Sequence, residues 1–333
     1  MTRKYAYFPG CSLEKMARSY HESAMETTRA LDVELQEIED WNCCGATEYI
    51  SLNLMASFAL IARNLAQATK TTGVNQLVAP CSACYLNLRK TDAYMQESPD
   101  LAKKVNQALS AGGLSYEGGT LKVRHLLDVV VNDIGLETIA SKVTRPLKGL
   151  RIAPYYGCMI VRPNFESTNG DGKSFDNTEY PMTLDNLLKT LGAEVVDFPM
   201  KAHCCGGHMT QISEATGFEM IRRLIKGASD YKADMIVTLC PMCQLNLDGF
   251  QGPMNRHFKT NYNMPVLYFT QMLGVAFGMD AASLGIGQEL VDARHALAKI
   301  GVEVPQPEKP AAPKKSKKDD KSLPMPLMGK VEE

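Results

Sequence analysis

The sequence predicts an α/β protein made of two duplicated modules, each a small parallel sheet flanked by helices, related by a pseudo-twofold axis. First, its ten cysteines form two sets of five in the same order: a single cysteine, a vicinal pair followed by glycine, and a C-x-x-C motif. Second, the surrounding residues repeat, as KYAYFPGC (4–11) and RIAPYYGC (151–158) illustrate. Third, short apolar runs alternate with helical patterns, which favours parallel strands joined by helices.

The alternation of apolar runs and helical patterns extends through both halves of the chain. Cys11, Cys81, Cys158 and Cys240 each follow a strand-like run. Because ligands of parallel sheets collect at the carboxyl ends of the strands, we expect the five cysteines of a module at one edge of its sheet. Strands are predicted at 5–8, 33–38, 77–79, 152–155, 194–198, 235–238 and 266–269, and helices at 18–30, 47–70, 85–96, 183–191, 208–229 and 243–251.

The repeat places the boundary between the modules near residue 145. We expect a first module at 1–145, a second at 146–300, and a Pro- and Lys-rich tail at 301–333. A long loop is expected at 160–181, which accounts for the wider cysteine spacing of the second module, and a Gly-rich linker at 110–120.

The composition and net charge argue against a nucleic-acid-binding or membrane protein. The chain has 333 residues, 45% of them apolar and 22% charged, and a net charge of −1, so we expect neither a nucleic-acid partner nor an anionic membrane surface. The N-terminus lacks a signal-peptide pattern, and no transmembrane segment is expected. We therefore expect a cytoplasmic protein with reduced thiols, whose cysteines serve metal or redox chemistry rather than disulfides.

Five thiols in each module are one more than a structural zinc ion or an ordinary four-iron cluster uses. Thiolates select zinc, copper(I) and iron–sulfur clusters. The vicinal pair places two sulfurs at one corner of a site, and Gly45 and Gly206 allow the backbone to turn sharply beside the metal. An unusual iron–sulfur cluster in each module is the leading interpretation, and a pair of structural zinc sites is the alternative.

The motifs resemble a known family. The segments that carry the resemblance are FPGC (8–11), CCGA (43–46), CSAC (81–84), YGC (156–158), CCGG (204–207) and CPMC (240–243). Over about residues 4–285 the chain resembles the duplicated CCG-domain family, and within it the B subunit of heterodisulfide reductases. PVLYFTQMLGVAFGM (265–279) is similar to the C-terminal segment of that family.

The resemblance implies the cofactors and partners. It implies two non-cubane [4Fe-4S] clusters, one in each module and each held by five cysteines. The two clusters would flank the site at which a disulfide is reduced. The implied partners are a ferredoxin-like subunit and a flavin-containing subunit. The implied ligands are Cys11, Cys43, Cys44, Cys81 and Cys84 for the first cluster, and Cys158, Cys204, Cys205, Cys240 and Cys243 for the second.

The hypothesis for function is disulfide reduction by the catalytic subunit of a heterodisulfide reductase-like complex. Cleaving a disulfide takes two electrons, and two clusters can supply one each. The candidate catalytic residues are Cys44, Cys205, His203 and His208, of which the histidines flank the second vicinal pair and could carry protons near neutral pH. Lys201 could bind an anionic group of the substrate.

Two other functions stay open. One is a quinone-linked or electron-relay CCG subunit of a fumarate-reductase-like or hydroxyacid-oxidising complex. An amphipathic surface at 270–300, including LGVAFGM (273–279), would favour membrane contact and hence this alternative. The other is a non-catalytic assembly or relay subunit, which predicts clusters with no open face for a substrate.

Overall fold

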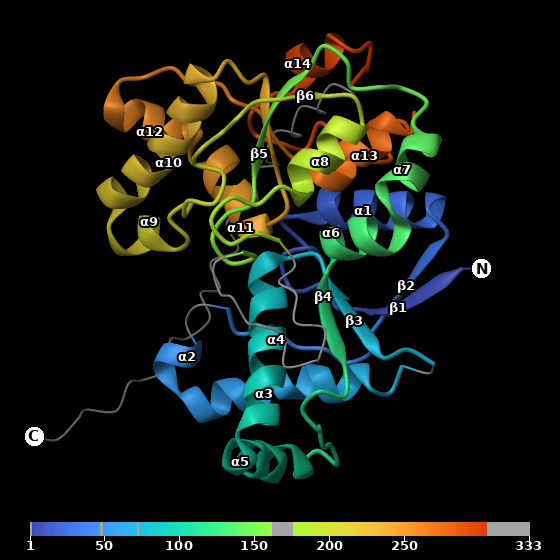
Figure 1. Ribbon diagram of the computed structural model, residues 1–333. Coiled ribbons are helices and arrows are strands. Elements are labelled where there is room, and N and C mark those ends of the chain that lie inside the picture. Colours follow the sequence, from blue (N-terminus) through green and yellow to red (C-terminus); the bar gives the residue numbers. More distant parts are fainter. Residues whose placement is uncertain (1, 47–48, 72, 162–175, 305–333) are drawn as a thin grey trace, which may run out of the picture.

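The computed structural model describes residues 2–46, 49–71, 73–161 and 176–304. They form two four-stranded sheets in which every strand pair is parallel, with the orders β2-β1-β3-β4 and β6-β5-β7-β8 (Figure 1). The predicted fold class, two repeated α/β modules, is confirmed. The strands are β1 (Arg3–Tyr7), β2 (Val33–Glu37), β3 (Gln76–Ala79), β4 (Lys122–His125), β5 (Arg151–Tyr155), β6 (Glu194–Val195), β7 (Met235–Thr238) and β8 (Val266–Tyr268).

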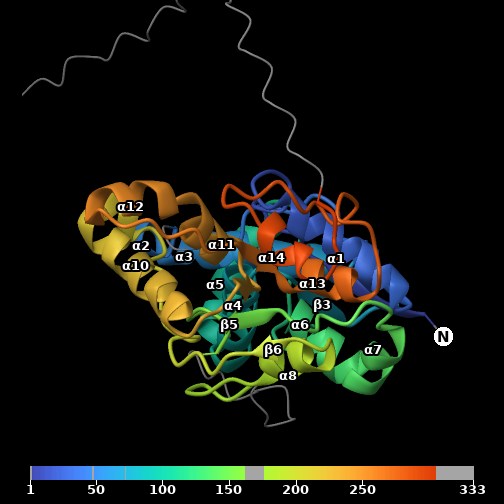
Figure 2. The ribbon, with the colours of Figure 1, turned by 90° about the horizontal axis from the view of Figure 1, so that it is seen from above.

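Helices connect the strands and cover the sheets. Viewed from above, α10 and α12 lie side by side along one flank (Figure 2). The α-helices are α1 (Arg18–Ala30), α2 (Tyr49–Leu52), α3 (Leu54–Ala68), α4 (Ser82–Glu97), α5 (Pro99–Ser110), α6 (Leu126–Asp128), α7 (Leu136–Lys142), α8 (Thr183–Thr190), α9 (Met209–Ile212), α10 (Glu214–Asp230), α11 (Pro241–Gln244), α12 (Gln251–Phe258), α13 (Phe269–Ala276) and α14 (Arg294–Ala298), and π-helical turns follow α6 at Val129–Ile134 and α11 at Leu245–Gly249.

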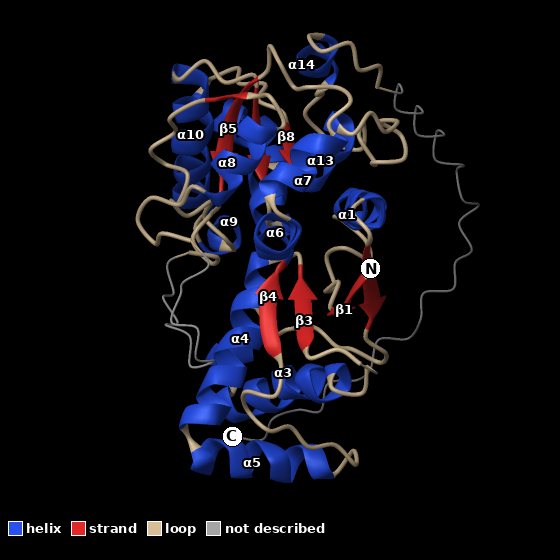
Figure 3. Ribbon diagram, turned by 45° about the vertical axis from the view of Figure 1, so that its right-hand side comes forward, coloured by secondary structure: helices blue, strands red, loops and turns tan. Residues whose placement is uncertain are grey.

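The two modules share an interface made of corresponding helices. Helix α1 packs on α13 and α6 packs on α8, and these helices lie between the two sheets (Figures 1 and 3). In this layer Tyr20 stacks on Tyr268 with ring centroids 4.2 Å apart, and Ser23 Oγ lies 2.6 Å from Thr270 Oγ1. The buried apolar residues of both modules form one cluster, so the modules pack as a single body around a shared core.

The predicted strands agree with the observed ones to within one or two residues, with two differences. The run predicted at 194–198 forms a strand only over Glu194–Val195, although Val196 N still donates to Ile152 O. Strand β4 was not predicted, because three of its four residues are polar or charged. Its Arg124 is 6% exposed and pairs with Asp128 and Asp133, so the strand is buried in spite of its composition.

The long helices predicted at 47–70, 208–229 and 243–251 are interrupted. Asn53 ends α2 and accepts a hydrogen bond from Ala56 N, which starts α3 as a separate helix. Ser213 takes the corresponding place between α9 and α10. The third helix starts earlier than predicted, at Pro241, and passes through a π-helical turn, a feature that often occurs at functional sites.

The Gly-rich segment 110–120 is part of the first module and not a linker. Asp92 of α4 accepts hydrogen bonds from Tyr116 Oη at 2.5 Å and from Gly119 N at 2.8 Å. A Cβ atom at Gly118 would lie 2.4 Å from Gln96 N, so glycine is needed where the segment crosses the end of α4.

Within the described residues, no helix combines the length and hydropathy needed to cross a bilayer. Residues 273–276 of the apolar segment 273–279 belong to α13, in which every residue is buried, and Phe277 and Met279 are half-buried. Residues 273–276 therefore provide no exposed apolar surface for membrane contact. Most of the loop predicted at 160–181 and nearly all of the tail lie outside the described residues.

Candidate functional site

The ten cysteine side chains form one continuous series of thiol–thiol contacts that crosses the boundary between the modules. The contact between Cys81 and Cys240 joins the two sets. On each side of this contact the order is the same: the second cysteine of the C-x-x-C motif, the second and then the first of the vicinal pair, and finally the single cysteine. The complete series is Cys11, Cys43, Cys44, Cys84, Cys81, Cys240, Cys243, Cys205, Cys204 and Cys158.

Strand ends and helix starts position these thiols. Cys81 is the N-cap residue of α4 and Cys240 that of α11, so each C-x-x-C motif turns into a helix directly after a strand. Residues three apart in a helix share a face, which brings the two sulfurs of each motif together. Cys11 Sγ lies 3.9 Å from Cys43 Sγ, and Cys44 Sγ lies 3.2 Å from Cys84 Sγ.

Exposure falls along the series from its ends to its centre. Cys11 is exposed, Cys43 is half-buried, and Cys44, Cys81 and Cys84 are buried. In the second module Cys158 and Cys204 are half-buried, whereas Cys205, Cys240 and Cys243 are buried. The centre of the series therefore lies inside the protein and its ends approach the surface.

Mutual hydrogen bonding distributes the protons unevenly among the thiols. Hydrogen bonds from Cys11 and Cys44 lower the pKa of Cys43 to about 2. Because Cys44 donates to Cys43, the pKa of Cys44 is raised to about 12. In the second module, the bond to Cys204 raises the pKa of Cys205 to about 12. Hydrogen bonds from Cys243 and Cys81 lower the pKa of Cys240 well below its usual value. Each set thus contains a thiol that ionises readily, as metal binding requires.

Two glycines allow the backbone to approach the sulfurs closely. Gly10 has φ +75° and Gly157 has φ +69°, a conformation that favours glycine. A Cβ atom at Gly10 would lie 2.9 Å from Cys84 Sγ, and one at Gly157 would lie 2.8 Å from Cys243 Sγ. In both modules the loop before the single cysteine therefore leaves room for the C-x-x-C sulfur and for no side chain.

Two asparagines that sequence reasoning missed hold the vicinal pairs in place. Asn87 Nδ2 donates to Cys44 O at 3.0 Å. Asn246 Nδ2 donates to Gly207 O at 2.8 Å and to Cys205 O at 3.2 Å, and it lies 3.4 Å from Cys205 Sγ. The signal for both was present in the sequence, since each asparagine follows the second C-x-x-C cysteine by three residues in the repeated pair CYLNL and CQLNL.

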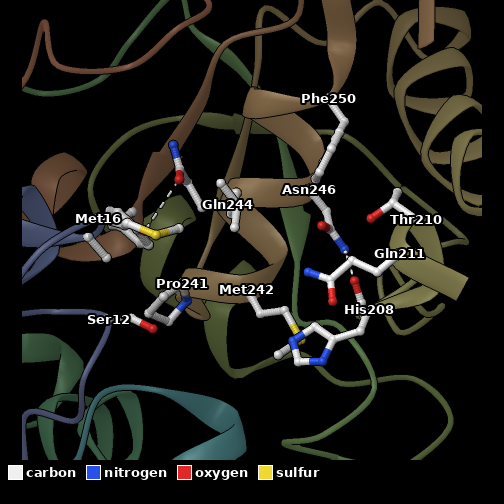
Figure 4. Close-up of a pocket in the computed structure, with 14 residues that line it drawn as sticks. Ser12, Met16, His208, Thr210, Gln211, Pro241, Met242, Gln244, Asn246 and Phe250 are labelled. Carbon is white, nitrogen blue, oxygen red and sulfur yellow. Dashed lines mark hydrogen bonds between the residues drawn. The ribbon is translucent and has the colours of Figure 1, made fainter. Parts of the chain in front are cut away.

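A cavity of about 280 Å³ opens beside the second set of cysteines (Figure 4). Its wall combines Ser12 and Met16 from the first module with residues after the second vicinal pair and residues of α11 and the π-helical turn. None of its lining residues is Lys, Arg, Asp or Glu. The lining residues are Ser12, Met16, Ala17, Gly207, His208, Thr210, Gln211, Pro241, Met242, Gln244, Leu245, Asn246, Phe250 and Tyr268.

The other candidate residues differ in their relation to this cavity. His208 lines it, whereas His203 is exposed and lies beside Cys204 in a separate surface depression. Lys201 does not present its charge to a substrate. Its side chain is 2% exposed, and Nζ lies 3.0 Å from Asp185 Oδ1, because a buried ammonium group requires a paired carboxylate.

The donor set fits a polynuclear sulfur-ligated centre. All ten side chains in the series are thiols, the ligands of iron–sulfur clusters. Within the described ranges, no three Cys, His, Asp or Glu side chains surround a single ion position. The sulfurs run side by side as a series instead of forming a cage around one ion.

The fold and the site define a duplicated α/β protein with a set of five cysteines at the carboxyl edge of each parallel sheet. The model of the cysteine-rich domain family, CCG, matches residues 5–89 and 152–248. The chain therefore belongs to the CCG family, in which the predicted resemblance had placed it. Each matched range begins in the first strand of a module and includes its C-x-x-C motif.

Relatives cover nearly the whole chain. It is 33% identical over 293 residues to the 8-methylmenaquinol:fumarate reductase membrane anchor subunit of Wolinella succinogenes. The aligned residues cover 88% of this chain and 99% of that protein. It is 29% identical over 300 residues to the B subunit of the ferredoxin/F(420)H(2)-dependent CoB-CoM heterodisulfide reductase of Methanosarcina acetivorans, with 89% and 97% covered. The chain is thus similar to subunits of oxidoreductase complexes.

A solved structure supports the fold. A hypothetical protein from Helicobacter pylori superposes with a TM-score of 0.70 at 18% identity, over 88% of this chain. This chain spans 52% of that protein, so the likeness concerns the duplicated fold and not an activity.

Proposed function

We propose that the chain is the catalytic subunit of a heterodisulfide reductase-like complex and binds two non-cubane [4Fe-4S] clusters, one in each set of five cysteines. Bound clusters would supply single electrons, and two of them together would serve a two-electron substrate. The observation that carries the proposal is the contact between Cys81 and Cys240, which makes the two sets neighbours. Centres this close could both reach one disulfide bond.

The cavity beside the second set is the proposed substrate site. Cys11 precedes its wall residue Ser12, and Cys240 and Cys243 enclose its wall residues Pro241 and Met242, so a ligand there would lie close to cysteines of both modules. His208 is the candidate proton carrier because it lines this cavity. A disulfide in this site, whether a CoM-S-S-CoB-like molecule or a sulfur carrier, would present an uncharged portion to the wall.

The same lining favours a second candidate, a quinone-linked subunit of a fumarate-reductase-like complex. The wall combines the amide and hydroxyl groups of Thr210, Gln211 and Gln244 with apolar Met242 and Phe250, and no wall residue bears a fixed charge. Such a wall suits a neutral ring with hydrogen-bond-accepting carbonyl groups. The relative from Wolinella succinogenes, whose name includes 8-methylmenaquinol, is consistent with this candidate.

The test is to purify the chain without air and to measure iron, sulfide and zinc. The proposal expects about eight irons per chain, since each of two clusters contains four. Electron paramagnetic resonance spectra are then recorded with the CoM-S-S-CoB disulfide and, separately, with a soluble naphthoquinol. A signal that depends on the disulfide supports the first candidate, and a change produced by the quinol alone supports the second. One or two zinc ions per chain would contradict both.

A further inference from the structure

The first module exposes an apolar surface next to its cysteines. The residues of this surface, which we call the α2–α3 patch, are Tyr49 (41% exposed), Leu52 (81%), Leu54 (52%), Met55 (37%) and Leu60 (39%). Helix α2 contains no buried residue at all and lies at the outer end of α3 (Figure 1). Single exposed apolar residues are common, but a cluster of five within twelve positions indicates a contact surface.

The duplication shows that the fold does not require an apolar residue at position 54 of this patch. The second module has the same helix pair, in which buried Phe218 corresponds to buried Phe58, and the N-cap Ser213 corresponds to Asn53. In this register, Leu54 corresponds to Glu214, which begins α10. The module therefore folds with a charged residue at that position. Folding alone therefore does not explain Leu54, whereas the exposed Leu52 has an exposed apolar counterpart in Ile212.

The patch is directly connected to the first set of cysteines. A Cβ atom at Gly45 would lie 2.9 Å from Cδ2 of Tyr49, so the Tyr49 ring lies against the glycine that follows Cys44. Cys11 is exposed and Cys43 half-buried, and these are the two least buried thiols of the first set. A molecule bound to the patch would therefore lie close to the most accessible side of the first centre.

The surroundings of these two thiols are acidic. A surface depression that contains Cys11 and Cys43 is lined by four carboxylates, and its other lining residues include no Lys or Arg. The carboxylates belong to Glu14, Glu37, Glu39 and Asp40, of which Asp40 forms an ion pair with Arg63. Anionic lipid surfaces bind Lys and Arg, so this acidic surface opposes docking on a membrane. It complements a protein face with basic side chains around an apolar centre.

We propose that the α2–α3 patch and the acidic depression together bind the iron–sulfur subunit that exchanges electrons with this chain, through an apolar face bordered by Lys and Arg. This inference rests on the proposed function, because a partner of this kind is needed only if the first set of cysteines holds a redox centre. It places the entry or exit of electrons at the first module and leaves the cavity beside the second set of cysteines to the substrate.

The test compares three variants of the full-length chain in complexes purified without air from the native host. Leu52→Glu and Leu54→Glu change the patch, and the second introduces the residue that the other module already has at this place. Ile212→Glu is the matched control, because Ile212 is 79% exposed and corresponds to Leu52. Quantitative mass spectrometry gives the amount of the iron–sulfur subunit that co-purifies with each variant, and the iron content of this chain is measured alongside.

In both patch variants the amount of co-purified iron–sulfur subunit is expected to be about one tenth of the wild-type amount or lower, while the control retains the wild-type amount. In the wild-type complex, carbodiimide cross-links should join Glu14, Glu37 or Glu39 to lysines of that partner.

The proposal is overturned if the patch variants retain the partner to the same extent as the control does, if no iron–sulfur partner accompanies the wild type, or if cross-links fall on the second module. Release of the patch variants from phosphatidylglycerol vesicles that bind the wild type would identify a membrane surface instead. Normal iron content in all variants separates failed docking from failure of the proposed function.

Discussion

Replacement of Gly157 by alanine tests whether the backbone approach to the sulfurs is required for a bound centre. The new Cβ atom would lie 2.8 Å from Cys243 Sγ, whereas ordinary contacts begin at 3.4 Å. The sulfur must therefore move by about 0.6 Å, the difference between these two distances. Metal–ligand distances tolerate about 0.2 Å. We expect the second set of cysteines to lose its centre.

The matched control is Gly301→Ala. Gly301 has the same φ of +69° as Gly157, but a Cβ atom there meets nothing within 4 Å. Both variants therefore carry the backbone strain of about 1–2 kcal/mol for an L-residue in the left-handed region, and only Gly157→Ala carries the clash.

The assay is iron per chain after purification without air. Gly157→Ala should contain about half the wild-type iron, since one of two four-iron clusters is lost, and Gly301→Ala the full amount. Gly10→Ala should lose the centre of the first module for the same reason, because its Cβ atom would lie 2.9 Å from Cys84 Sγ. Equal iron in Gly157→Ala and Gly301→Ala would refute the reasoning.

Three further predictions follow from particular contacts. Asn246→Leu removes a donor 3.4 Å from Cys205 Sγ and should lower the reduction potential of the second centre. Asn87→Leu removes only a hydrogen bond to the carbonyl oxygen of Cys44 and should lower the reduction potential of the first centre by less. Equal shifts of the two potentials in a redox titration would contradict this. Lys201→Met leaves Asp185 buried without its cation and should lower the free energy of unfolding by about 3–5 kcal/mol in urea titrations, and an unchanged midpoint would argue against the ion pair. Burial raises the pKa of Asp92 above 3.8, so the stability that this carboxyl group contributes is present at low pH and is lost as the pH rises. Unfolding free energies of Asp92→Asn should consequently fall less than those of wild type as the pH rises above about 4, and parallel curves would exclude the effect.

The duplication, the alternation of apolar runs with helical patterns and the positions of the cysteines after strand-like runs together predicted the fold class and the placement of the thiols at the carboxyl edges of two parallel sheets. The apolar strands in the centre of each sheet were predictable because their residues must be buried on both faces. Strand β4 was not, since the burial of its Arg124 depends on ion pairs with Asp128 and Asp133 and a hydrogen bond to Gln76, which the sequence does not reveal.

The order of contacts among the thiols could not be predicted from spacing. It depends on how the modules interlock through α1 and α13, and the stacking of Tyr20 on Tyr268 in that layer has no sequence pattern. The sequence allowed Lys201 to bind an anionic group of the substrate, but its partner Asp185 lies in a helix that only the fold brings near.

The most direct test of the central claim, that two cysteine sets hold neighbouring iron–sulfur centres, is the magnetic interaction between those centres. Electron paramagnetic resonance spectra are recorded for the wild type in states where both centres are paramagnetic, and for Cys205→Ala, which should retain the centre of the first module. We predict a broadened or split signal in the wild type that becomes a simple signal in the variant. Two independent signals in the wild type, with the remaining one unchanged in Cys205→Ala, would contradict the account.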